Sequence, residues 1–285
     1  MKKKKFEVSS IFIYIVLIFW SLTTIYPIIW VVQNSFKAKD KILANSFSLP
    51  TGELFTLANY RKAFDNLNIF GAYKNSIFIS TVVALAVVIL AGMASFALVR
   101  YSFKLKGTLQ SLVMAAMMFP VFATIIPVFS MEAKWGIANT SSWGLTMLSV
   151  ILPQIAGNLA FAIVVLTGFI RGLPIELEEA AYLEGCNVFQ IFYKVVVPLT
   201  KPSFATVAIF SFLWSYNDLF TQMFFLRRPE MRAITRLLNE LTSQEGTNYG
   251  LMAAAVTLVV VPVLIVYIFL QKYIIKGMTA GAVKG

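Results

Sequence analysis

The polar residues best placed to contact a solute are Asn217 and Asp218, which follow Trp214 and Tyr216 in an otherwise apolar stretch of the chain. An ionisable group within a long apolar segment is costly, so it usually faces a cavity or a partner. In one interpretation the pair forms the polar wall of a solute path, with Trp214 or Tyr216 stacking on the solute. In the other, the pair satisfies a break in a helix near the outer surface of a membrane. The residue types alone leave both interpretations open.

A second polar pair, Gln154 and Asn158, lies in another apolar stretch with a spacing of four residues. That spacing places both amides on one face of a helix, one turn apart. The two residues are therefore further candidates for the same path. Amides in apolar helices also form hydrogen bonds to neighbouring helices, and this role stays equally open.

The chain lacks the side chains that most enzyme and metal sites need. It contains no histidine, which removes the usual general base near neutral pH and the commonest metal ligand, and Cys186 is its single cysteine. No glycine is followed directly by lysine, so a Walker-type phosphate-binding loop is excluded. We therefore expect no catalytic residue, no metal site and no bound cofactor in this chain. If ATP is used, it is expected to bind with Mg²⁺ to another chain.

The stretch from Arg171 to Pro202 separates two apolar segments and has the pattern of a short helix, a turn and a second short helix. Pro174 suits a first helical turn, and the glutamates that follow it lie near the positive end of the helix dipole. Gly185 is suited to end this helix in a left-handed conformation. The second helix then has one apolar stripe, formed by Val188, Ile191, Phe192 and Val195.

Hydrophobicity determines the expected fold class. Of 285 residues, 59% are hydrophobic and only 13% are charged, and the mean hydropathy is +0.78. A soluble domain carries about 25% charged residues, whereas a transmembrane helix needs about 20 mostly apolar residues. The sequence predicts an all-α, polytopic membrane protein, a single domain over residues 1–285 with about six transmembrane helices. The expected spans are residues 11–32, 76–99, 109–129, 145–170, 203–226 and 251–270.

The basic residues indicate the orientation of these spans. With the N-terminus inside, the cytoplasmic parts carry a larger excess of basic over acidic residues than the outer parts, as the positive-inside rule requires. Both termini, the loop over residues 171–202 and the tail over residues 271–285 are then expected in the cytoplasm. The net charge of +11 does not indicate nucleic-acid binding, because the basic residues are scattered between apolar segments. The first span is too long for a signal peptide and no small-residue cleavage site follows it.

Several expected spans contain proline, which removes a backbone hydrogen bond and bends a helix. Bent helices either satisfy local packing or line a path and flex during gating, and the sequence does not distinguish these roles. The prolines concerned are Pro120, Pro127, Pro153 and Pro262.

The loop over residues 171–202 closely resembles the EAA loop of bacterial ABC importer permeases. The resemblance rests on the run Glu179-Ala180-Ala181-x-x-Glu184-Gly185, followed at fixed spacing by Phe192, Val195, Pro198 and Pro202. The family usually has aspartate and alanine where this chain has Glu184 and Cys186. Further similarity to the carbohydrate-uptake branch, and to the shorter permease of maltose-type systems, lies in Trp143-Gly-Leu…Pro153, Gly168–Pro174, Trp214-x-x-Asn217-Asp218 and Gln271–Gly285.

This resemblance implies a sugar importer whose loop couples the membrane helices to an ATPase. The coupling residues would be Glu179, Ala180, Ala181, Glu184, Gly185, Phe192 and Pro198. The implied partners are a second homologous permease, two ATPase subunits that bind ATP and Mg²⁺, an extracytoplasmic sugar-binding protein and membrane lipid, in a bacterial cell membrane. No nucleic acid is implied.

One alternative of a different class remains, a secondary transporter of a small polar solute. Neither a glutamate on a cytoplasmic loop nor the missing Walker motif excludes it. We find no internal repeat in the sequence, which weighs against the secondary transporters built from inverted repeats.

Overall fold

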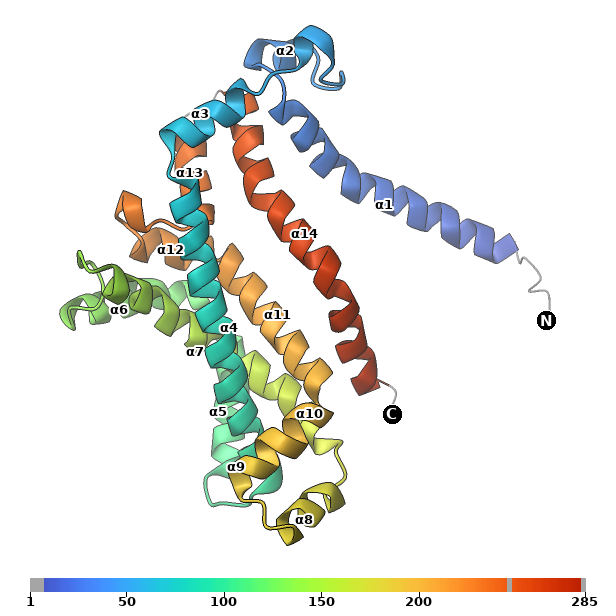
Figure 1. Ribbon diagram of the computed structural model, residues 1–285, viewed down its shortest axis with the longest axis vertical. Coiled ribbons are helices and arrows are strands. Elements are labelled where there is room, and N and C mark those ends of the chain that lie inside the picture. Colours follow the sequence, from blue (N-terminus) through green and yellow to red (C-terminus); the bar gives the residue numbers. More distant parts are fainter. Residues whose placement is uncertain (1–7, 245–247, 283–285) are drawn as a thin grey trace. The chain divides into compact units, whose positions relative to one another are not determined.

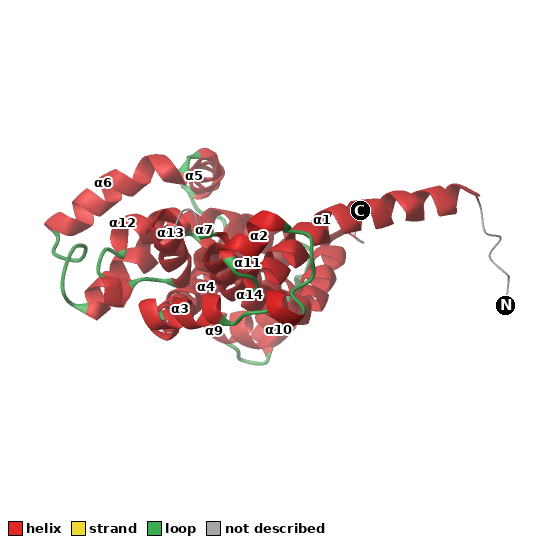
Figure 2. Ribbon diagram, turned by 90° about the horizontal axis from the view of Figure 1, so that it is seen from above, coloured by secondary structure: helices red, strands yellow, loops and turns green. Residues whose placement is uncertain are grey.

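The computed structural model describes residues 8–244 and 248–282, and within these ranges it contains helices, turns and loops but no strand (Figure 1; Figure 2). This confirms the predicted all-α fold class. In chain order the elements are α1 (Val8–Ser35), α2 (Lys39–Ala44), η1 (Gly52–Leu54), α3 (Ala58–Asn66), α4 (Ile69–Arg100), α5 (Lys106–Met118), α6 (Val121–Lys134), α7 (Trp143–Arg171), α8 (Glu176–Leu183), α9 (Val188–Ile191), η2 (Phe192–Val196), α10 (Val197–Leu199), α11 (Lys201–Asn217), α12 (Leu219–Phe225), η3 (Pro229–Met231), α13 (Ile234–Gln244) and α14 (Tyr249–Ala282).

Four helical segments are long and apolar enough to cross a membrane, namely Ser10–Ser35, Ile69–Arg100, Trp143–Arg171 and Tyr249–Phe269. Two pairs of helices meet the same standard when each pair is taken together, although both pairs are sharply bent. The part of the chain that the structure describes therefore has four candidate spans, or six if each bent pair crosses as one. This range agrees with the expectation of about six.

The segment expected as one span over residues 109–129 is instead two helices, α5 and α6, which meet at an angle of 102°. The break falls at Phe119 and Pro120, both of which have extended backbone conformations. Proline lacks the N–H that would continue the helix, and it disfavours the helical conformation of the residue before it. The two effects together end α5 and redirect the chain. The other three prolines lie inside continuous helices and are Pro127, Pro153 and Pro262.

The segment expected as one span over residues 203–226 is interrupted at Asp218, between α11 and α12. The Oδ1 atom of Asp218 accepts a hydrogen bond of 3.0 Å from the backbone N–H of Thr221. Asp218 is thus the N-cap of α12, a position that aspartate favours because its carboxylate satisfies an otherwise unpaired N–H. At the other end of α11 the chain bends by 85° at Thr200, between Leu199 and Lys201.

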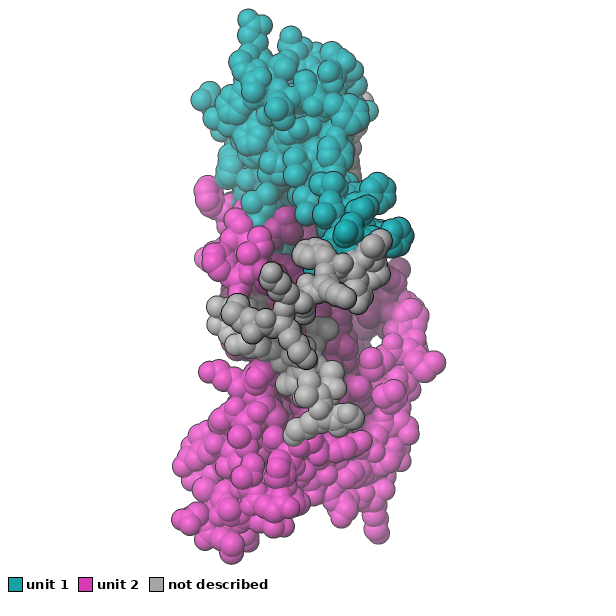
Figure 3. Space-filling model, turned by 90° about the vertical axis from the view of Figure 1, so that its right-hand side faces the viewer, with its two compact units in different colours: residues 1–69, 238–263 teal, residues 70–237, 264–285 magenta. Residues whose placement is uncertain are grey.

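The chain divides into two compact units, which Figure 3 colours separately. Residues 1–69 and 238–263 form the first. There the side chain of Lys37 is fully buried, and its Nζ donates hydrogen bonds to the carbonyl oxygens of Asn45 (3.1 Å) and Ser48 (2.7 Å). Burial lowers the pKa of this amine. The bonds fasten the loop after α2 to the segment that follows α1.

Residues 70–237 and 264–285 form the second unit, whose core lies mainly between α4 and α7. The Oγ of Ser95 in α4 donates a hydrogen bond of 3.0 Å to the carbonyl of Ile163 in α7. Gly92 lets α4 approach α11 closely, because a Cβ there would lie 2.6 Å from the ring of Phe204. Fully or almost fully buried residues of this core include Ile79, Val83, Val87, Val150 and Leu166.

Candidate functional site

The hairpin over residues 171–202 begins with α8, whose first turn carries Glu176, Glu178 and Glu179. Carboxylates at this end of a helix interact favourably with its dipole. The helix ends at Leu183, and Gly185, two residues further on, has φ +83°. A residue with a side chain would adopt this left-handed conformation only at a cost of about 1 kcal/mol or more. The turn predicted from the glycine is therefore present.

The second arm of the hairpin starts with a capping box, in which the side chains of Asn187 and Gln190 each accept a hydrogen bond from the other residue's backbone N–H. α9 then passes into the π-helical turn η2, which changes the register of the side chains. As a result the predicted apolar stripe is only partly correct. Ile191 is buried, but Val188 is exposed and Val196, outside the stripe, is fully buried.

Most of the predicted coupling residues lie on the surface of this hairpin. Ala181 and Phe192 are half-buried, whereas Glu179, Ala180, Glu184, Gly185 and Pro198 are exposed. Exposed apolar side chains accompany them, with Leu183 at 86% and Phe189 at 67% of their full accessibility. Exposed apolar side chains outside the candidate membrane spans are suited to a protein–protein contact.

A buried ion pair connects the hairpin to α4, and sequence reasoning missed it. Glu178 is buried, and its Oε1 accepts a hydrogen bond of 2.7 Å from Nε of Arg100. Nη2 of Arg100 lies 2.7 Å from the same oxygen and donates a hydrogen bond of 3.0 Å to the carbonyl of Leu173. The hairpin also contacts α4 through the ring of Phe192, whose centroid lies 5.6 Å from that of Phe96. The sequence indicated that three glutamates share the first turn of α8, but not which of them faces the membrane helices.

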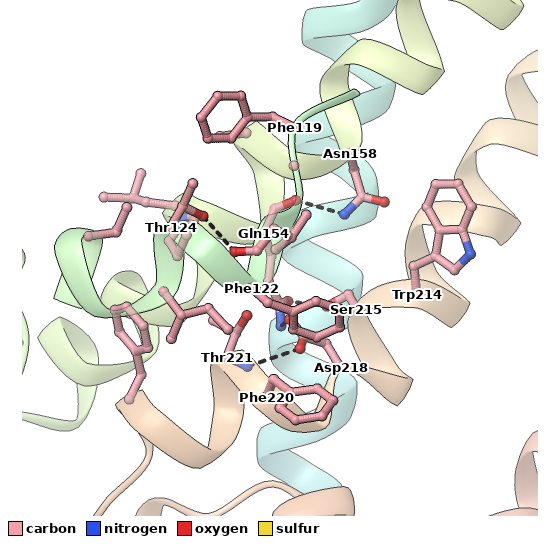
Figure 4. Close-up of a pocket in the computed structure, with 18 of the residues that line it drawn as sticks. Phe119, Phe122, Thr124, Gln154, Asn158, Trp214, Ser215, Asp218, Phe220 and Thr221 are labelled. Atoms are coloured by element: carbon pink, nitrogen blue, oxygen red, sulfur yellow. Dashed lines mark hydrogen bonds between the residues drawn. The ribbon is translucent and has the colours of Figure 1, made fainter. Parts of the chain in front are cut away.

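A pocket of about 910 Å³ lies where the bent helices meet α7 (Figure 4). It is lined by residues of α5, α6, α7, α11 and α12, and most of these residues are apolar. Five of the six residues predicted for a solute path line this pocket: Gln154, Asn158, Trp214, Asn217 and Asp218. The sixth, Tyr216, does not line it. Its side chain is only 4% exposed and its ring lies against that of Phe212, with the centroids 6.1 Å apart.

Gln154 connects the polar groups of the pocket. Its Nε2 donates to Oδ2 of Asp218 at 2.9 Å, and its Oε1 accepts from the hydroxyl of Ser215 at 2.5 Å. Gln154 therefore bonds a neighbouring helix, which was one of its two expected roles, and lines the pocket as well. Asp218 likewise combines both interpretations, because it caps a helix break and faces the pocket. The amide of Asn158 donates within its own helix, to the carbonyl of Gln154 at 2.7 Å.

The pocket also contains a carboxyl group that the sequence analysis did not select. Glu132 of α6 lines the pocket and is only 2% exposed, and its Oε2 has no hydrogen-bond partner. The residue lies beyond the expected span over residues 109–129, in the connection to the next expected span. Glu132 is seven residues after Ile125 and four after Val128, so all three lie on one face of α6. A prediction that the helix continues to residue 134 would have placed Glu132 on this inner face.

Within the described ranges, no group of three or more Asp, Glu, Cys or His side chains is arranged to hold a metal ion. Cys186 is half-buried and its thiol is free.

Long apolar helices, two sharply bent helix pairs, a largely apolar pocket and an exposed hairpin are the features of a polytopic helical membrane protein. Residues 88–280 match the family described as binding-protein-dependent transport system inner membrane component. The chain belongs to this family.

Two relatives and one solved structure illustrate the similarity. The arabinooligosaccharide transport permease of Halalkalibacterium halodurans is 30% identical, with all of both chains covered. The diacetylchitobiose uptake permease of Streptomyces coelicolor is 31% identical over 93% of this chain and 86% of the relative. A chain of a bacterial ABC transporter that imports the acidic polysaccharide alginate has the same fold, with a TM-score of 0.79, 22% identity and coverage of 96% and 99%.

Proposed function

We propose that this chain is the membrane-spanning permease subunit of an ATP-driven importer that translocates a sugar or oligosaccharide. Membership of the binding-protein-dependent family and the substrates of two relatives, arabinooligosaccharides and diacetylchitobiose, support the proposal. The observation that carries the ATP-driven part is the exposed hairpin, because a surface with Glu179, Gly185 and Leu183 accessible is suited to bind a partner outside the membrane.

The partners follow from this role. A second, homologous permease completes the sugar path, and two ATPase subunits on the cytoplasmic side bind ATP and Mg²⁺, so this chain hydrolyses nothing itself. An extracytoplasmic binding protein delivers the sugar. In this assembly closure of the ATPase subunits moves the hairpin as a rigid body, and the helices joined to it change the access to the path.

The pocket at the bent helices is the part of the sugar path that this chain contributes. Trp214 lies at its wall with 46% of its side chain exposed, and aromatic faces pack well against the apolar faces of sugar rings. Gln154, Asn158, Asn217 and Asp218 supply the few polar groups that orient a bound molecule in an otherwise apolar site.

Reconstitution of the complete transporter in proteoliposomes tests the proposal. We expect accumulation of the sugar carried by the cognate binding protein, with an absolute need for ATP, for the ATPase subunits and for that protein. Uptake that continues without the ATPase subunits and follows an ion gradient would instead establish the alternative, a secondary transporter.

A further inference from the structure

Glu132 has the properties of a ligand-binding group rather than of a packing residue. It is 98% buried, since only 2% of its surface is exposed, yet its Oε2 has no hydrogen-bond partner. Burying a carboxyl oxygen without a hydrogen bond costs free energy. Such an oxygen is therefore expected where a bound molecule donates the missing hydrogen bond. Because Glu132 lines the pocket of about 910 Å³, that molecule is whatever occupies the pocket.

The second carboxylate of the pocket, Asp218, is held in place by two N–H donors. Its Oδ1 accepts from the backbone of Thr221 at 3.0 Å and its Oδ2 from the side chain of Gln154 at 2.9 Å. The two acids come from different helices, α6 and the start of α12, and those helices pack against each other. They give the pocket two fixed acceptor groups.

The described lining of the pocket offers no basic side chain to balance these acids. Among the residues that the structure shows lining the pocket there is no lysine or arginine, and the remaining walls are apolar, aromatic or neutral polar. Figure 4 shows the rings of Phe119, Phe122, Trp214 and Phe220 around the polar groups, and the rings of Phe122 and Phe220 lie 4.8 Å apart. A buried anionic ligand would have no counter-charge here, and burying an unpaired charge is strongly unfavourable.

We propose that Glu132 accepts hydrogen bonds from sugar hydroxyl groups and that this pocket admits uncharged sugars in preference to acidic ones. The inference rests on the proposed function, sugar import, and names the substrate class of the same site. Hydroxyl donors satisfy the free oxygen of Glu132, whereas the aromatic walls pack against the apolar faces of the rings. A uronic acid would instead bring a carboxylate towards two carboxyl groups in a region of low dielectric.

The proposal is tested on the complete transporter in lipid nanodiscs, with ligand binding to the membrane domain measured by equilibrium titration in the absence of the binding protein. The probes are maltotriose, which is neutral, and trigalacturonate, which has the same number of rings and three carboxylates. We expect maltotriose to bind at least about tenfold more tightly, the size of effect expected for a single well-placed charge interaction.

Two variants separate recognition from structure. Glu132→Gln preserves the shape of the side chain and is expected to weaken maltotriose binding by about tenfold, since one of the two oxygens is replaced by an NH2 group that cannot accept a hydrogen bond. Glu132→Lys adds a cation and is expected to shift the ratio of the two affinities towards trigalacturonate by about tenfold or more. The matched control is Glu53→Gln, because Glu53 is exposed and does not line the pocket; it should change neither affinity.

Equal changes in the affinities of both probes in Glu132→Gln would show a structural role only and overturn the proposal. Binding of neither probe to a transporter that imports its cognate sugar would also overturn it while leaving the proposed function intact. Absence of ATP-dependent uptake in the same preparation would contradict the proposed function, sugar import, rather than the role of Glu132.

Discussion

At the scale of single residues, the ion pair of Arg100 and Glu178 is a polar contact that joins the hairpin to the membrane helix α4. The pair is largely buried, with about a tenth of each side chain exposed, and Arg100 also holds the carbonyl of Leu173. Arginine suits this position because its guanidinium group donates several hydrogen bonds in a fixed geometry. α8 is thereby attached to the end of α4, a helix of 32 residues.

Removal of one partner of this pair should destabilise the protein. We expect Arg100→Met to lower the free energy of unfolding by about 3 kcal/mol, because Glu178 would remain buried without its counter-charge. Thermal unfolding of the purified complex measures the effect. The double variant Arg100→Met, Glu178→Met should recover much of the loss, since apolar residues can replace a buried pair at little cost.

The control is Glu176→Gln, which neutralises an exposed glutamate in the same turn of α8. It should change stability by less than about 1 kcal/mol, as exposed charges usually do. Equal effects of Arg100→Met and Glu176→Gln would contradict the assignment of a structural pair.

The sequence was informative about residue types but not about contacts at this scale. It predicted five of the residues that line the pocket, because polar groups in apolar helices are conspicuous. The sixth candidate, Tyr216, is buried and does not line the pocket, and Glu132 and Arg100 were not among the predicted residues. Which face a side chain occupies depends on helix register and on breaks, and neither can be determined from residue type alone.

At the scale of elements, the bend between α5 and α6 creates the pocket, and Pro120 is its physical cause. Phe119 and residues of α6 line one side of the pocket, so a straight helix would remove that wall. The sequence predicted a bend here but not one of 102°. A proline sets a local restriction, whereas the final angle depends on packing of α6 against α7 and α12.

Replacement of Pro120 by alanine should allow the helix to continue. We expect the distance between spin labels at residues 112 and 128 to increase in Pro120→Ala, because straightening separates the two helices, and sugar uptake to fall severalfold as the pocket is lost. The labels require a background in which Cys186 is replaced by serine. Pro262→Ala is the matched control, since α14 is continuous through Pro262 and this residue does not line the pocket. An unchanged distance in Pro120→Ala would show that packing alone maintains the bend.

At the scale of the whole molecule, the orientation in the membrane is a prediction from the distribution of basic residues. Both termini and the hairpin over residues 171–202 are expected in the cytoplasm, and residues 33–73 and 227–250 outside. The composition was sufficient to predict a polytopic helical protein, because the apolar segments have no other stable environment. The number of membrane crossings could not be determined from the sequence, because a bent pair of helices has the same composition as one continuous apolar helix.

Cysteine labelling in intact cells tests the orientation. In a background without Cys186, we expect an impermeant thiol reagent to modify Thr51→Cys and to spare Lys194→Cys until the membrane is permeabilised. Both positions are exposed on the protein. A difference in their reaction with the reagent therefore reports the side of the membrane on which each lies. Modification of Lys194→Cys in sealed cells would place the hairpin outside and remove the basis for ATPase docking.

The central claim is that the hairpin couples an ATPase to the membrane helices, and the retention of ATPase subunits on purified variants tests it most directly. Gly185→Val and Glu179→Lys should reach the membrane at near-normal levels but lose most of the bound ATPase and most sugar uptake. Gly52→Val is the control for backbone strain, because Gly52 also has a positive φ, +55°, with no atom close to its Cβ position. It should retain the ATPase. Normal uptake by Gly185→Val and Glu179→Lys, with the ATPase still bound, would show that the hairpin is not the coupling site.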